Sequence, residues 1–257
     1  MVPLAFAFAL AGLCFAAAQA PPGAMLDGTK AQLQPPPQSP GALPPESRGD
    51  IFMARKMYRE AIEAFAEGPK NNAVLVNKTG IAYHQMQQLD RAMKCYQQAL
   101  KLKPTYAEAQ NNIGTVYYAR KSYRRAIGAY RKALRLAPSS ASIHMNLGTA
   151  YFSRNMEKES IAEYRTALQL DPDVFEHHGT YGVLLEERSV VEKAKYHYAL
   201  AKLYASSSRQ DLALQYLRKA LEEGFRDRKK LAQDPEFQAM RELPEFQELL
   251  TLEPRVL

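Results

Sequence analysis

Few side chains in this sequence are placed where they could carry out a reaction. The adjacent histidines His177 and His178 could supply metal ligands, and the acidic pair Glu186 and Glu187 could act in proton transfer. Neighbouring residues on a helix point about 100° apart, so neither pair converges on one atom. The sequence contains no phosphate-binding glycine loop, nucleophile elbow or metal-ligand spacing. We therefore predict that the chain is not an enzyme and needs neither a metal nor a cofactor.

Glycine and proline mark a repeating unit that must position the remaining side chains. The interval is 34 residues, and the positions that keep it are Gly80, Gly114, Gly148, Gly182, Pro104, Pro138 and Pro172. A fixed period of this size is typical of stacked copies of one small unit, each contacting only its neighbours. The sequence therefore predicts a repeat protein, whose function depends on an extended surface.

Each unit is predicted to be a helical hairpin. Gly114 is followed by Tyr117, Ala126, Tyr130 and Ala133, and the units on either side keep these offsets. Spacings of three and four put such residues on one helix face, where small side chains leave room for an aromatic ring from the partner helix. Proline ends the second helix because it cannot continue the hydrogen-bond ladder. A single hairpin cannot bury its own apolar face, so stacked neighbours must complete the core.

This pattern resembles the tetratricopeptide repeat family, whose 34-residue signature runs aromatic, Leu-Gly, Tyr, Ala, Phe and Pro. The agreement is closest over residues 73–106, 107–140 and 141–174, and looser units flank it at Gly49 and Gly182. The resemblance implies an all-α fold, a right-handed α-solenoid of about five to six stacked helix-turn-helix hairpins over residues 47–223. Short helices over 224–257, where the sequence PEFQ occurs twice, are expected to cap the apolar end.

The N-terminal part of the sequence differs from the repeats. Residues 1–20 are apolar, carry no charged side chain and close on Ala18-Gln19-Ala20, which is typical of a secretory signal peptide cleaved after Ala20. An uncleaved membrane anchor is the alternative. Residues 21–46 are rich in proline and are expected to form a disordered linker. We therefore expect an exported protein of the bacterial periplasm or cell envelope.

The first helices of stacked hairpins line a concave face, which is our candidate partner-binding groove. Residues three before, one after and four after each glycine share this face, and asparagines two before the glycine lie at its edge. The groove residues are Asn77, Ile81, His84, Asn111, Asn112, Thr115, Tyr118, Met145, Asn146, Thr149, Phe152 and Glu186. Amides can bond a peptide backbone and aromatic rings can bury apolar side chains, so we predict an extended peptide or a protein as the partner. The alternative for the asparagines is packing against the next repeat.

Positive charge is concentrated in the middle of a chain whose formal net charge is +7. Residues 73–140 hold twelve Lys and Arg but only two acids. The second helices, on the convex side, carry a basic patch of Lys94, Arg124, Arg125, Arg131, Lys132 and Arg135. This patch could meet an anionic membrane surface or an acidic protein, or it could be an ordinary solvated surface. Nucleic acid is not expected as a partner of an exported protein.

Three functional hypotheses follow from these patterns. The first is a non-catalytic protein-protein interaction scaffold of the cell envelope, which binds its partner in the concave groove. The second is a peripheral membrane adaptor that acts through the basic convex face. The third is an accessory domain of an enzyme complex.

Overall fold

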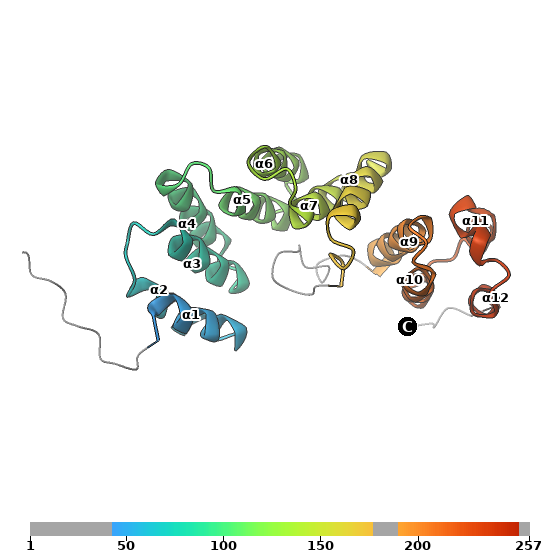
Figure 1. The fold of residues 1–257 in the computed structure, drawn as a ribbon, viewed down its shortest axis with the longest axis horizontal. Helices are drawn as coiled ribbons and strands as arrows, with labels where there is room; N and C mark the ends of the chain where they lie inside the picture. Colours follow the sequence, from blue (N-terminus) through green and yellow to red (C-terminus); the bar gives the residue numbers. More distant parts are fainter. Residues whose placement is uncertain (1–42, 177–189, 252–257) are drawn as a thin grey trace, which may run out of the picture. The chain divides into compact units, whose positions relative to one another are not determined.

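The computed structural model describes residues 43–176 and 190–251 of the protein, and within these ranges every regular element is helical (Figure 1). The α-helices are α1 (Pro45–Ala54), α2 (Tyr58–Ala66), α3 (Ala73–Gln85), α4 (Leu89–Leu102), α5 (Ala107–Ala119), α6 (Tyr123–Leu136), α7 (Ala141–Phe152), α8 (Glu157–Leu170), α9 (Val190–Ser206), α10 (Gln210–Glu222), α11 (Arg228–Gln233) and α12 (Pro244–Thr251). A 3₁₀-helix, η2 (Pro235–Met240), lies between the last two. The predicted all-α fold class is confirmed.

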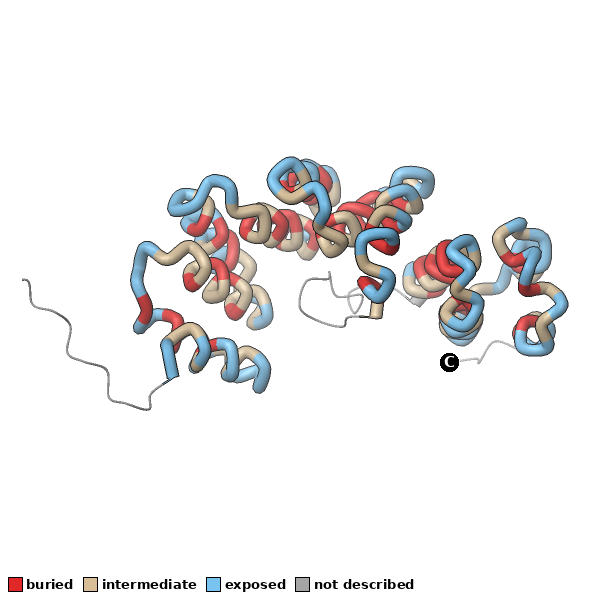
Figure 2. The backbone as a smooth tube through the Cα atoms, in the orientation of Figure 1, coloured by how far each residue is buried: buried red, intermediate tan, exposed pale blue. Residues whose placement is uncertain are grey.

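Consecutive helices form five antiparallel pairs that stack in chain order. The pairs are α1–α2, α3–α4, α5–α6, α7–α8 and α9–α10. The second helix of each of the first three pairs packs against the first helix of the next pair. Burial follows this arrangement: α7, a first helix, buries seven of its 12 residues, whereas α8, a second helix, buries four of 14 (Figure 2). Helix α7 is therefore enclosed by its own partner α8 and by the preceding hairpin, as expected in an α-solenoid.

The repeating glycine lets the two helices of each hairpin approach closely. A methyl group added to Gly114 would lie 2.5 Å from Cε1 of Tyr130, a residue of α6 whose side chain is fully buried. Gly49, Gly80 and Gly148 face an aromatic ring 16 residues later in the same way. No side chain larger than hydrogen fits between the helices at these points. The 16-residue spacing between the glycine and the aromatic ring is therefore a packing requirement.

Turn geometry repeats as strictly as the glycine. The residue seven places after the glycine lies in the left-handed region in each hairpin turn, with φ between 56° and 60°. These residues are Lys56, Gln87, Lys121, Asn155 and Ser208. At the other end of the hairpin, the residue before each repeating proline is extended, with φ between −138° and −146°, which stops the second helix.

The left-handed residue Ser208 shows that the repeat spacing starts anew in the last hairpin, out of step with the 34-residue interval. Counting back seven residues from its turn gives Ala201, which takes the glycine position in α9. Tyr204 and Leu217 then fall three and 16 residues later, and all three side chains are buried. Helix α9 therefore opens a further hairpin, which α10 completes. Gly182, on which the preceding unit was placed, lies outside the described residues.

The C-terminal helices cover the last hairpin, as expected for a cap. Leu231, Phe237, Met240, Phe246 and Leu249 are at most 1% exposed and belong to the same apolar core as the buried faces of α9 and α10. The ring of Tyr198 on α9 stacks on Phe225 with centroids 4.0 Å apart. Without this segment the apolar flank of α9 and α10 would be in water.

The N-terminal predictions lie mainly outside the described part of the chain. The predicted signal peptide, residues 1–20, and nearly all of the predicted linker, residues 21–46, fall among residues 1–42, which the structure does not describe. Helix α1 begins at Pro45, inside the last two residues assigned to the linker. Proline is accommodated there because the first residue of a helix has no acceptor for its N–H. Glu186 of the predicted groove also lies outside the described residues.

Candidate functional site

The candidate site is the face formed by α3, α5 and α7, which we call the first-helix face. Its residues stand three before, two before, one after and four after the repeating glycine. The described residues of this face are Asn77, Lys78, Ile81, His84, Asn111, Asn112, Thr115, Tyr118, Met145, Asn146, Thr149 and Phe152. They occupy corresponding positions on successive helices, but they differ greatly in exposure.

A ladder of polar contacts joins neighbouring first helices. The residue two before the glycine reaches the residue three before the glycine of the preceding repeat. Asn112 Nδ2 donates to Asn77 Oδ1 at 3.1 Å, and Asn146 Nδ2 donates to Asn111 Oδ1 at 3.0 Å. At the next step towards the N-terminus, an ion pair replaces the amides and links Lys78 Nζ to Glu46 Oε1 at 2.8 Å. We call these three contacts the first-helix ladder.

The ladder amides are buried, so their hydrogen bonds fix the register between repeats. Asn77 and Asn146 are 0% exposed and Asn111 is 3% exposed. Asn77 Nδ2 also donates to Glu108 Oε1 at 2.9 Å. A buried amide without a partner costs free energy, and only the stacked arrangement supplies these partners. The structure thus places these asparagines between repeats, and only Asn112 of the four predicted groove asparagines is half-buried.

Asn146→Ala tests the structural role of the ladder. We expect the free energy of unfolding to fall by about 1–2 kcal/mol, because the carbonyl oxygen of buried Asn111 loses its donor. Urea unfolding followed by circular dichroism measures this loss. Gln97→Ala, an exposed amide on α4, is the matched control and should change stability by less than about 0.5 kcal/mol. Equal stability of the two variants would contradict the proposed role.

Other predicted groove residues support buried tyrosines. Tyr130 OH donates to Thr115 Oγ1 at 3.4 Å, and the hydroxyls of Thr149 and Tyr164 lie 3.0 Å apart. Burial raises the pKa of Tyr130 well above its ordinary value, so its hydroxyl stays protonated. Tyr118 is 5% exposed, and its hydroxyl lies 2.7 Å from Ser153 Oγ. The threonine one residue after the glycine therefore hydrogen-bonds a buried tyrosine of its own hairpin.

Apart from Lys78, whose charge is paired with Glu46, the accessible part of the first-helix face is uncharged and partly apolar. Its half-buried members are Ile81, His84, Asn112, Thr115, Met145 and Phe152. Burial lowers the pKa of His84, which favours a neutral ring at pH 7. The ring of Phe152 packs edge-on against Tyr196 with centroids 5.7 Å apart. Such a surface can cover apolar side chains and bond a peptide backbone, and binding by these residues stays a prediction.

The predicted basic convex patch is exposed but divided. Lys94 lies on α4, and Arg124, Arg125, Arg131, Lys132 and Arg135 lie on α6, all of them exposed. Arg131 reaches the next repeat, where its Nη2 donates to Tyr151 OH at 2.5 Å. Arg124 and Arg125 stand instead at the first turn of α6, beside the α5–α6 turn. The patch therefore comprises two groups of cations with different surroundings.

Two kinds of site are not found among the described residues: a cluster of metal ligands and a helix that could span a membrane. No group of three His, Cys, Asp or Glu side chains in these ranges could hold a metal ion. His144 is placed between the Glu163 carboxylate, 2.6 Å from Nδ1, and the Pro138 carbonyl, 2.9 Å from Nε2. His177 and His178 lie outside the described ranges. Within these ranges, no helix combines the length and apolar character needed to cross a membrane.

Stacked hairpins, polar contacts between repeats and a partly apolar first-helix face define an α-helical repeat protein with a surface suited to binding. Comparison with protein families also identifies a helical repeat. The family described as TPR repeat matches residues 80–120 and 114–155, and the family described as Tetratricopeptide repeat matches residues 141–174 and 194–223. The chain is a tetratricopeptide repeat protein. Domains of this family are generally protein-protein interaction modules and typically non-catalytic. The match over 194–223 covers the hairpin of α9 and α10, in which Ala201 takes the glycine position.

Solved structures with similar folds include MamA proteins. MamA from Desulfovibrio magneticus RS-1, residues 41 to the end, is 22% identical, with a TM-score of 0.47 over 70% of this chain and 92% of that one. Another crystal structure of MamA is 21% identical, with a TM-score of 0.46 over 68% and 93% of the two chains. The first TPR domain of Spaghetti (RPAP3), bound to the HSP90 peptide SRMEEVD, is 23% identical over 42% and 86%, with a TM-score of 0.40. No curated protein matches the chain.

Proposed function

We propose that the protein is a non-catalytic scaffold of the cell envelope that binds an extended segment of a partner protein along the first-helix face. The observation that carries this proposal is the first-helix ladder. Its buried hydrogen bonds hold α3, α5 and α7 in one register. Each of the three repeats thereby presents at least one half-buried side chain one or four residues after its glycine, which a continuous extended ligand requires; these are Ile81, His84, Thr115 and Phe152.

The chemistry of the face favours a particular kind of segment. The accessible residues offer apolar surface at Ile81, Met145 and Phe152 and hydrogen-bonding groups at Asn112 and Thr115. None of these five is charged, so the ligand need not carry charge. A segment with alternating apolar side chains would bury them against the face and leave its backbone for the polar groups.

Site-specific photo-crosslinking in the native cell tests this surface. A benzophenone amino acid placed at His84 or Phe152 should give a discrete protein adduct that survives washing in high salt. The same probe at Gln97, on the exposed side of α4, is the matched control and should not give this adduct. An identical adduct from all three positions, or none from the two face positions, would contradict the proposal.

Export is the second part of the proposal, and the N-terminal sequence supports it. Residues 1–20 have the apolar character and small-residue ending of a cleaved signal. N-terminal sequencing of the native protein should find Pro21 as the first residue. Met1 as the first residue in the mature protein would contradict cleavage and favour a retained anchor or a different compartment.

The basic convex face is the basis of the alternative, a peripheral membrane adaptor. Arg124, Arg125 and Lys132 are exposed, and no ion pair with an acid joins them within the described residues. Binding through such charges weakens when salt is raised, because exposed charges are screened. Loss of envelope association by salt alone, with no face-specific adduct, would therefore favour this alternative over the scaffold.

A further inference from the structure

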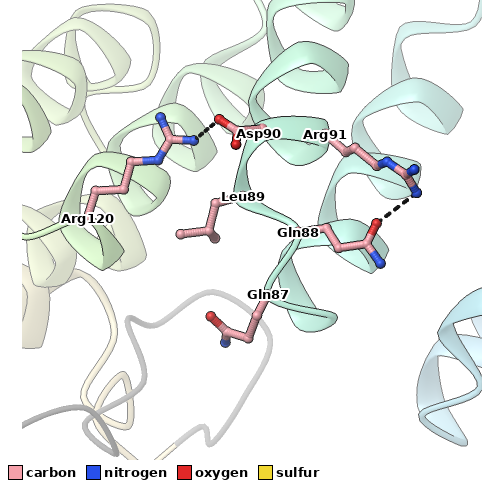
Figure 3. Close-up of a pocket in the computed structure, with 6 residues that line it drawn as sticks. All are labelled: Gln87, Gln88, Leu89, Asp90, Arg91 and Arg120. Atoms are coloured by element: carbon pink, nitrogen blue, oxygen red, sulfur yellow. Dashed lines mark hydrogen bonds and ion pairs between the residues drawn. The ribbon is translucent and has the colours of Figure 1, made fainter.

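Two cavities occupy the same place in successive repeats. The first, about 680 Å³, is lined by Gln87, Gln88, Leu89, Asp90, Arg91 and Arg120 (Figure 3). The second, about 310 Å³, is lined by Lys121, Ser122, Tyr123, Arg124, Arg125 and Arg154. Each is formed by five residues of one hairpin turn and an arginine six places after the next repeating glycine. The two sets correspond residue by residue, so their differences can be compared directly.

The first cavity is electrically nearly balanced. Arg120 Nη2 donates to Asp90 Oδ1 at 2.6 Å, and Arg91 Nη1 donates to Gln88 Oε1 at 2.9 Å (Figure 3). Two arginines and one aspartate give the lining a formal charge of +1. Both guanidinium groups therefore already have an acceptor within the protein.

The second cavity has lost its acid and gained two cations. Arg124 stands where Asp90 stands in the first cavity, and Lys121 replaces Gln87. The lining thus carries Lys121, Arg124, Arg125 and Arg154, a formal charge of +4. No ion pair within the described residues joins any of the four to an acid. Arg125 is oriented by the ring of Tyr117, with Cζ 5.9 Å from the centroid.

The four cations are exposed around a pocket that is open to solvent, and an anion held between them would offset their mutual repulsion. Arginine forks match the oxygens of a phosphoryl group, and the cavity also contains Ser122, whose side chain does not cap α6. The N-terminus of the 14-residue helix α6 adds partial positive charge at the same place. We propose that this cavity, which we call the turn pocket, binds a phosphoryl group carried by a soluble phosphate compound or a lipid headgroup.

The test titrates the full-length mature protein with inorganic pyrophosphate and measures binding by isothermal titration calorimetry. A second arm uses vesicles of phosphatidylcholine with and without phosphatidic acid, followed by sedimentation. Pyrophosphate binding with one site per chain assigns a soluble phosphate. Binding only to phosphatidic acid vesicles assigns a lipid headgroup. No binding in either arm overturns the proposal.

Two variants tie the binding to the turn pocket. Arg124→Asp copies the first cavity and should weaken binding at least tenfold, whereas Lys132→Asp makes the same charge change on α6 outside the pocket and should weaken it less than threefold. Equal weakening by both variants would reveal general attraction to charge and overturn the site. Circular dichroism checks that both remain folded.

The reverse exchange adds a gain of function. Gln87→Lys combined with Asp90→Arg gives the first cavity the charges of the turn pocket. In the soluble-phosphate case the number of pyrophosphate sites should rise from one to two, and in the lipid case binding to phosphatidic acid vesicles should strengthen. An unchanged result would show that these residues do not define the site.

Discussion

Gly114→Ala is expected to lower the free energy of unfolding by about 2–3 kcal/mol, the upper part of the range for overpacked cores. The added methyl group would lie 2.5 Å from Cε1 of Tyr130, and that ring is 0% exposed, so it has no space into which to move. Alanine is otherwise the better helix former, so the sign of the effect identifies steric conflict as its cause. Urea unfolding of the full chain measures the change.

Gly128 provides the matched control on α6. A methyl group added there meets nothing within 4 Å, so Gly128→Ala should stabilise the protein by about 0.5–1 kcal/mol. Adding Tyr130→Leu to Gly114→Ala should recover part of the loss, because the last hairpin already pairs Ala201 with Leu217 at the same positions. Strictly additive effects of Gly114→Ala and Tyr130→Leu would contradict the proposed contact.

Asp234→Ala is expected to loosen the C-terminal cap and to lower stability by about 3 kcal/mol. Asp234 Oδ2 accepts from Tyr198 OH at 2.6 Å and lies 3.0 Å from Lys202 Nζ, and the side chains of Asp234 and Lys202 are 14% and 15% exposed. Hydrogen bonds to a charged group at this depth contribute about 1.5–3 kcal/mol each. Hydrogen exchange should show faster opening of α11, η2 and α12, with α3–α6 unchanged. Glu242→Ala, an exposed acid of the same segment, should leave exchange unaltered.

The same cluster predicts the pH dependence of the cap. Burial alone would raise the pKa of Asp234, but hydrogen bonds from Tyr198 and Lys202 outweigh it and the pKa lies below 3.8. The contribution of Asp234 is therefore complete above pH 3.8 and is lost as pH falls through the lower folded value. Burial alone would lower the pKa of Lys202, but Asp234 and Glu236 raise it above 10.5, so its contribution is lost only at more alkaline pH. Asp234→Asn should flatten the acid limb of the stability profile, and an unchanged limb would contradict the assignment.

The repeating fold could be predicted from sequence because glycine is required where two helices touch. Gly80, Gly114 and Gly148 each face a buried tyrosine, and no other residue meets that demand. Ala201 escaped detection because leucine replaces the aromatic ring in its hairpin, which leaves room for a methyl group. Its position is also 53 residues after Gly148, which breaks the 34-residue interval. A repeat of this kind can be found only by searching for the residues three, 12, 16 and 19 places after the glycine position, without requiring glycine itself.

The candidate site was predicted less well, since adjacent residues of a first helix differ in exposure. The sequence marks Asn111 and Asn112 as polar, but only the position of the neighbouring repeat decides that the first is buried and the second half-buried. The Lys78–Glu46 contact was not anticipated either, because its residues differ in type from the asparagines that take the same places. Residue types reveal the repeat period, but they do not reveal which side chains the neighbouring repeat will cover.

Among the described residues, the polar contacts between side chains span no more than 40 positions of the chain. Mechanical tension applied at the two ends would therefore be opposed by contacts within and between neighbouring hairpins, and not by contacts between distant parts of the chain. Each hairpin that yields would release about 110–120 Å of extended polypeptide, the length of 34 residues. Such a chain would unfold one hairpin at a time under load and refold unit by unit.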